Sequence, residues 1–162
     1  MRASLLGAEP VVQDYIIASS TASDLEAVMA IESLSFPTPW PRQAWSDELG
    51  RSWARVEVLR EAASGRVVAF CNYWLVADEL QILNVAVHPD ERRHGHASHL
   101  LRHMLSEANR NRIRLVSLEV RASNQAAQAL YGKFAFREVG IRPKYYADNG
   151  ENAVLMDLEL GQ

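Results

Sequence analysis

One stretch of the sequence constrains the fold more than any other: a strand that runs through a short charged loop into a helix, followed by a second strand. Residues 79–87 have the pattern of a strand, residues 95–110 that of an amphipathic helix, and residues 115–120 that of a buried strand. Two strands joined by a crossover helix run in parallel when they share a sheet. We therefore expect the strand near Val85 and the strand near Leu118 to be parallel.

The rest of the chain supplies mainly antiparallel strands. The other expected elements are strands at 15–17, 53–61, 67–76, 137–141 and 153–160, and helices after Thr21, at 42–49 and at 124–134. Three consecutive strands in a meander precede the crossover helix. The order therefore predicts an α/β (α+β) fold built on a mixed central sheet of about seven strands.

Length and composition fit a single domain. The chain has 162 residues, and we expect an N-terminal extension at 1–12 and one domain at 13–162. The net charge is −3, and the chain lacks the strongly basic surface of a nucleic-acid-binding domain, so no direct nucleic-acid partner is expected.

The single cysteine, Cys71, excludes an internal disulfide framework. With no apolar run near the ~20 residues that span a bilayer, we expect no membrane association and a cytoplasmic location. The oligomeric state stays open.

The loop before the long helix has the features of a phosphate site. It carries Arg92, Arg93 and Gly95 directly before the helix. The first amides of a helix lack backbone partners and lie at the positive end of its dipole, so they bind phosphate, and a glycine lets the ligand approach closely. An ordinary helix start beside a solvated run of charges would have the same pattern. A Walker loop is excluded, because no Gly-Lys-Ser/Thr follows at its spacing.

The segment at 93–98 resembles the acetyl-CoA signature of the GNAT acetyltransferases. The resemblance implies acetyl-CoA as co-substrate and a GNAT fold, with helices on both faces of the sheet and the parallel βαβ crossover at the cofactor site. The implied pyrophosphate ligands are the amides of Arg93, His94, Gly95, His96, Ala97 and Ser98. The backbone groups implied to pair with the pantetheine arm and polarise the thioester are those of Val85, Ala86 and Val87. Many family members have a second glycine at the position of Ala97. Because alanine has a Cβ atom, a positive φ at Ala97 would strain the loop.

A second motif narrows the resemblance. Residues 118–127, 129–131 and 134–136 are similar to the RimI-type branch of the family, which acetylates the N-terminal alanine of a small-subunit ribosomal protein. Further matching pieces lie at 36–40, 145–146 and 149–153, so the resemblance covers residues 14–160.

Glu119 is the candidate general base. An α-amine has a reference pKa of about 7.7–8.0, so much of it is protonated at neutral pH and must lose a proton before it attacks. Glu119 lies between Leu118 and Val120 on an apolar strand, where a carboxylate costs desolvation energy unless it is paired or useful. The resemblance to the GNAT family implies that Glu119 is the catalytic general base. From the residues alone, a salt bridge with Arg121 or another arginine remains the alternative.

Tyr131 and Asn124 belong to the helix that follows this strand. The resemblance makes Tyr131 the general acid that protonates the departing CoA thiolate, and packing beside Phe134 on the same helical face is the alternative. Asn124 fits two compatible tasks, which are capping the helix and hydrogen bonding to the pantetheine arm.

Aromatic residues mark the expected acceptor side. The segment 36–41 contains three prolines that must end the preceding helix, and it forms a kinked loop with Phe36 and Trp40. The resemblance places this loop and the pair Tyr145-Tyr146 beside the acceptor. Hydrophobic packing explains the same residues equally well.

All five histidines fall between His88 and His103. His96, His99 and His103 share a helical face, a spacing that would allow a metal site. Because no nearby carboxylate or thiol completes this set, and because acetyl transfer from CoA needs no metal, we expect a solvated helix face and no metal.

These inferences lead to an N-acetyltransferase that acts on the N-terminal α-amine of a protein, with a ribosomal-protein alanine as the leading acceptor. One alternative is a GNAT enzyme for another protein N-terminus or a small amine. The other is a CoA-binding regulatory module without turnover. The presence of Glu119 and Tyr131 argues against the module, whereas variable loops build acceptor pockets and leave the first alternative open.

Overall fold

Seven strands form one mixed sheet, as predicted, and their order in the sheet is β1-β2-β3-β4-β5-β7-β6. The computed structural model describes residues 14–161, so the expected extension at 1–12 lies outside the described residues. The strands are β1 (Tyr15–Ser19), β2 (Ala54–Glu61), β3 (Val67–Val76), β4 (Glu79–Val87), β5 (Leu115–Arg121), β6 (Arg137–Arg142) and β7 (Ala153–Glu159). The helices are α2 (Leu25–Ser35), α3 (Arg42–Gly50), α4 (His96–Arg110) and α5 (Gln125–Lys133), with short 3-10 turns η1 (Ala22–Asp24) and η2 (Pro89–Glu91).

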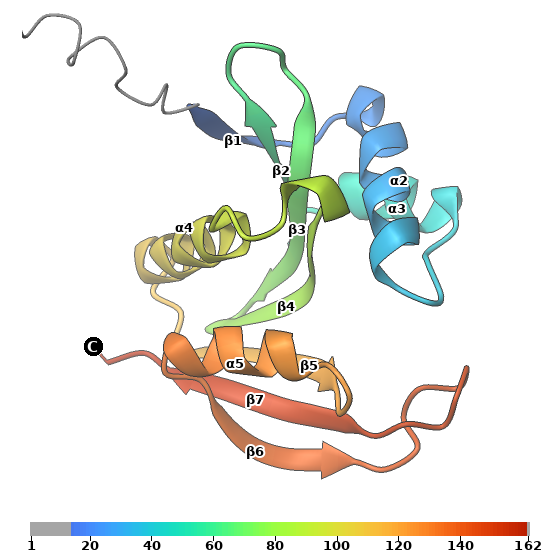
Figure 1. Ribbon diagram of the computed structural model, residues 1–162. Coiled ribbons are helices and arrows are strands. Elements are labelled where there is room, and N and C mark those ends of the chain that lie inside the picture. The colour runs from blue at the N-terminus through green and yellow to red at the C-terminus, as the bar shows by residue number, and fades with distance from the viewer. Residues whose placement is uncertain (1–13, 162) are drawn as a thin grey trace, which may run out of the picture.

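Helices cover both faces of the sheet, which confirms the predicted layers (Figure 1). Because side chains alternate along a strand, each strand serves two cores. Val58 and Phe70 pack with α2 and α3 on one face, whereas their neighbours Leu59 and Cys71 pack with α4 on the other. Cys71 is a buried free thiol. Among residues 14–161, no helix has the length and apolarity needed to cross a bilayer.

The parallel pair at the centre of the sheet separates part-way along its length. β4 and β5 are parallel, and their pairing runs from Glu79 opposite Leu115 to Ile82 opposite Leu118. On its other side, β4 shifts register against β3, so that Leu83 is the extra residue of a β-bulge. Residues 83–87 therefore run past the end of the β4–β5 pairing. The predicted parallel direction is confirmed, and the paired part of β4 ends at Ile82, before Val85.

Candidate active site

A cavity of about 920 Å³ lies where β4 and β5 separate. Its walls come from the loop between α2 and α3, from β4, β5 and α5, and from the loop between β6 and β7. Glu119, Asn124 and Tyr131 all line it, together with Val85 of β4. The structure thus brings both expected catalytic residues and part of the expected cofactor strand to one hollow.

Glu119 faces this cavity because of the alternation of β5. Leu118 and Val120 are buried in the core beneath the helices, so the intervening side chain points to the other face. The Glu119 side chain keeps 21% of its surface exposed, and its Oε1 lies 3.5 Å from Arg142 Nη1. A hydrogen bond to Glu119, together with burial, raises the pKa of the Tyr145 phenol. The carboxylate is therefore held by two neighbours and still open to the cavity.

Arg121 does not pair with Glu119. Its guanidinium binds Asp148 at 2.8 Å and Glu151 at 3.0 Å, and it stacks 4.0 Å above the ring of Tyr146. The hydrogen bond from Ser123, together with Arg121, lowers the pKa of Glu151 to about 2. These contacts fasten the turn after β5 to the β6–β7 loop. The salt bridge considered for Glu119 thus exists with Arg142, and Arg121 builds a wall of the cavity.

Tyr131 is both packed and open to the cavity. Its side chain is buried, and its ring centroid lies 5.5 Å from that of Phe136. Burial raises the pKa of the Tyr131 phenol, with a smaller contribution from the Cys71 thiol, so its hydroxyl stays protonated. Such a group can donate a hydrogen bond but does not readily ionise.

Asn124 caps α5, as predicted. Its Oδ1 accepts a hydrogen bond from the backbone amide of Ala127 at 3.1 Å. The Asn124 side chain is exposed and also borders the cavity. Capping of α5 therefore leaves it compatible with the expected hydrogen bond to the pantetheine arm.

The turn before α4 has the geometry expected of an anion site. Gly95 is the N-cap, with a φ of +76°, a left-handed conformation that favours glycine. It offers no side chain to cap the first-turn residues His96, Ala97 and Ser98. Ala97 lies inside the helix, so the strain considered for it does not arise. The left-handed residue besides Gly95 in this turn is Arg93, with a φ of +67°.

Comparison with known proteins identifies the family. Residues 25–136 match the model of the acetyltransferase (GNAT) family. The chain belongs to this family. It is therefore an acetyl-CoA-dependent N-acetyltransferase.

Relatives agree with this assignment. The [ribosomal protein bS18]-alanine N-acetyltransferase of Escherichia coli (strain K12) is 34% identical over 146 residues, which cover 89% of this chain and 97% of that protein. A Bacillus subtilis (strain 168) protein provisionally named for the same activity is 37% identical over 134 residues, covering 82% and 87%. The crystal structure of the ribosomal-protein-S18-alanine N-acetyltransferase from Escherichia coli matches with a TM-score of 0.84 and 33% identity, covering 92% and 96%.

The part of the cavity wall that α2 forms contains a residue that the sequence did not single out. Glu32 of α2 is buried and lines the cavity, and its Oε1 accepts hydrogen bonds from the Trp40 amide and from Trp45 Nε1, both at 3.0 Å. Burial raises the pKa of Glu32. The available signal was its position four residues after Val28, on the apolar stripe of the helix.

The two expected acceptor segments do meet at the cavity. Phe36 and Trp40 line it from one side, and Tyr145 and Tyr146 from the other. The Thr38 hydroxyl donates to Asp148 Oδ2 at 3.3 Å, which links the two loops. By contrast, Trp45 is a fully buried core residue.

Proposed function

We propose that this enzyme acetylates the N-terminal α-amine of a protein, with the alanine terminus of a small-subunit ribosomal protein as the leading acceptor. The observation that carries the proposal is the opening of Glu119 and Tyr131 into one cavity at the point where β4 and β5 separate. The choice of acceptor is supported by the names of the relatives that cover nearly the whole chain.

Acetyl-CoA supplies the activated thioester for this transfer. In our proposal its diphosphate is held by the amides of 93–98, where Gly95 leaves the first turn of α4 without a side-chain cap. The backbone of Val85, Ala86 and Val87 pairs with the pantetheine arm, because these residues run past the end of the β4–β5 pairing. Asn124, on the opposite wall, is close enough to the cavity to contribute a side-chain amide.

Glu119 and Tyr131 carry out the two proton movements. Glu119 takes a proton from the acceptor amine, whose nitrogen then forms a bond to the acetyl carbon as the carbon–sulfur bond breaks. The Tyr131 hydroxyl donates a hydrogen bond to the departing sulfur. A tyrosine has a reference pKa near 10 and a thiol one of ~8.5, so full transfer of the Tyr131 proton to the thiolate is uphill. The hydrogen bond from Tyr131 therefore stabilises the departing sulfur before any full proton transfer.

The acceptor enters between the aromatic loops. Thr38 and Asp148 join these loops at one point, and Trp40 is fixed by Glu32, so the opening has defined walls. A chain end carrying a free amine fits such a bordered opening, whose lining includes Glu119.

A direct assay tests the proposal. The protein is mixed with acetyl-CoA and a peptide that carries the ribosomal N-terminus, and the mass of the peptide is followed. We expect one added acetyl group, and none on a matched peptide with a blocked α-amine and a free lysine. Lysine acetylation would favour the alternative of a different amine acceptor. Binding of acetyl-CoA without turnover on any amine would favour the regulatory module.

A further inference from the structure

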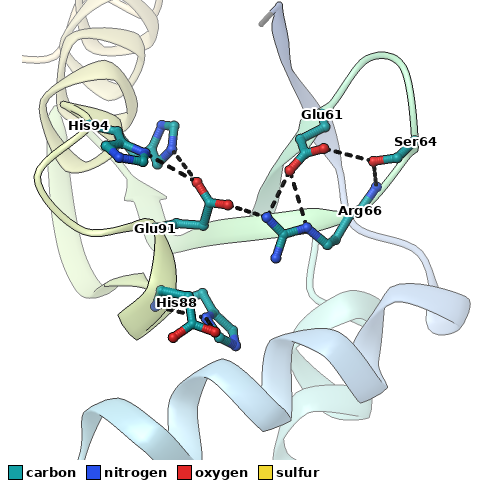
Figure 2. A network of polar contacts seen from close by, with 8 residues as sticks. Glu61, Ser64, Arg66, His88, Glu91 and His94 are labelled. Atoms are coloured by element: carbon teal, nitrogen blue, oxygen red, sulfur yellow. Dashed lines mark hydrogen bonds and ion pairs between the residues drawn. The ribbon is translucent and has the colours of Figure 1, made fainter.

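Three potential metal ligands meet beside the turn that leads into α4, outside the cavity described above. Glu91 Oε2 lies 3.3 Å from His94 Nδ1 and 3.4 Å from His96 Nε2. One ligand atom from each of these residues falls within 4.8 Å of the other two. Figure 2 shows His94 directed at the Glu91 carboxylate.

We propose that Glu91, His94 and His96 form a binding site for a divalent transition-metal ion of the zinc type. Two imidazoles and one carboxylate are a donor set that zinc uses, with the fourth position left to solvent. At metal–ligand distances of about 2.0–2.2 Å, two ligand atoms of a tetrahedral site lie about 3.4 Å apart. The separations of Glu91 Oε2 from the two histidine nitrogens match this value and exceed the ~2.7–2.9 Å of a charge-assisted hydrogen bond.

A second layer of contacts orients the carboxylate. Arg66 binds the other oxygen of Glu91, Oε1, and also binds Glu61 Oε1 at 2.8 Å (Figure 2). Outer contacts of this kind fix ligand geometry in metal sites. Glu61 and Glu91 together carry one more negative charge than Arg66 neutralises. This excess lies at the carboxylate that faces His94 and His96, where it would attract a cation.

The two histidines differ in a way that suits metal capture. The His96 side chain is 3% exposed, and its ring packs edge-on against Tyr15 at 4.5 Å, so this ligand is held in place. The His94 side chain is 57% exposed and provides an access path from solvent. Because His94 and His96 flank Gly95, a bound ion would also brace the turn before α4.

This site differs from the set of histidines that the sequence suggested. His103 points elsewhere, because its Nε2 lies 3.0 Å from Glu57 Oε2. His96 instead meets Glu91, which precedes it by five residues and lies outside the helix. The carboxylate that appeared to be absent from the helical set is therefore supplied by η2.

Titration with Co2+ tests the site, because four-coordinate Co2+ has a characteristic visible absorption and Zn2+ displaces it. The chain is used without a histidine tag. We expect one Co2+ per chain, displaced by one Zn2+. Loss of a residue that only hydrogen bonds to a metal ligand typically weakens metal binding by about 10–100-fold. His94→Gln removes a ligand itself, so it should weaken Co2+ binding by at least as much. This variant changes an exposed side chain, so it leaves the core intact.

His99→Gln is the matched control, since it removes a histidine of α4, the helix that carries His96, and His99 is not one of the three ligands. It should bind Co2+ as the unmodified chain does. His96→Gln should also lose the ion, with folding checked by circular dichroism. The proposal is overturned if the unmodified chain shows no such absorption, if His94→Gln keeps it, or if His99→Gln loses it too. Acetyl-CoA binding is measured separately, so failure of the metal site leaves the proposed transfer reaction untouched.

Discussion

Two carboxylates with the same local sequence pattern have different surroundings in this enzyme. Glu119 follows a leucine and precedes a valine on β5, and Glu57 lies between two valines on β2. Each has a tyrosine and a cationic or basic side chain as neighbours. Glu119 has Tyr145 and Arg142, whereas Glu57 has Tyr73 and His103.

The difference lies in what covers each strand face. α4 covers Glu57, which is 9% exposed and binds both the Tyr73 hydroxyl and His103 Nε2. Burial alone would raise the pKa of Glu57, but these hydrogen bonds hold it below its usual value. Glu119 opens into the cavity, with its nearest cation 3.5 Å away. Glu119 therefore has room beside it for a substrate amine, and Glu57 does not.

The largest effect is expected from Glu119→Gln. If Glu119 is the base, turnover should fall by about 10²–10⁴-fold, with little change in acetyl-CoA affinity. Steady-state kinetics and calorimetric titration measure the two quantities. Glu57→Gln is the matched control and should keep its turnover number at a temperature where it is folded. Near-normal turnover of Glu119→Gln at all pH values would show that another group accepts the proton.

A second comparison sets Tyr131 against Tyr73. Burial raises the pKa of both phenols, and in Tyr73 the hydrogen bond to Glu57 adds to it. Of these two tyrosines, Tyr131 lines the cavity and Tyr73 does not. Tyr131→Phe should lower turnover by about 10²-fold, the lower end for loss of an acid–base group, whereas Tyr73→Phe should affect stability instead. Equal turnover losses in the two variants would remove the distinction between the two regions.

The sequence predicted the elements better than their contacts. Hydrophobic periodicity predicted the seven strands and four helices, and Gly95 with the adjoining helix predicted the left-handed turn before α4, because these signals are local. The β4–β5 pairing ends at Ile82, beside the bulge at Leu83, and the bulge is defined by register against β3. Contacts such as Thr38 to Asp148, 110 residues apart, have no local signal. For the same reason the pattern around Glu57 and Glu119 could not separate them.

Glu32 is an intermediate case, since it is buried like Glu57 but lines the cavity like Glu119. Glu32→Gln keeps an acceptor oxygen for Trp40 and Trp45 but loses the charge. We expect a cost of about 0.5–1.5 kcal/mol in loop positioning, seen as a roughly 2–10-fold higher KM for the acceptor peptide. The turnover number should change less.

Glu26→Gln is the control for Glu32, because Glu26 lies on the same helix with 78% of its side chain exposed. Its kinetics should match those of the unmodified enzyme. A drop in the turnover number of Glu32→Gln as large as that of Glu119→Gln would instead make Glu32 part of the chemistry.

The smallest effect on turnover, and a distinct effect on stability, is expected at Glu57. Its lowered pKa stabilises the fold above its usual value of 4.5, and this contribution is lost as the pH falls through the lowered value. The hydrogen bond to Glu57 raises the pKa of His103 despite burial, so its contribution is complete below the usual 6.5 and is lost as the pH rises through the raised value. Between pH 4.5 and pH 6.5, the contributions of Glu57 and of His103 both stabilise the fold.

Glu57→Gln should therefore lower the free energy of unfolding by about 1–3 kcal/mol near pH 5–6, the range for a hydrogen bond to a charged group. The deficit should shrink as the pH rises through the raised pKa of His103, and also as it falls through the lowered pKa of Glu57. Urea unfolding of both proteins across this range measures it. Glu119→Gln, whose carboxylate is open to the cavity, should show no maximum near pH 5–6. A deficit for Glu57→Gln that is equal at all pH values would mean that the pair acts by packing, and charge would then no longer distinguish the covered carboxylate from the open one.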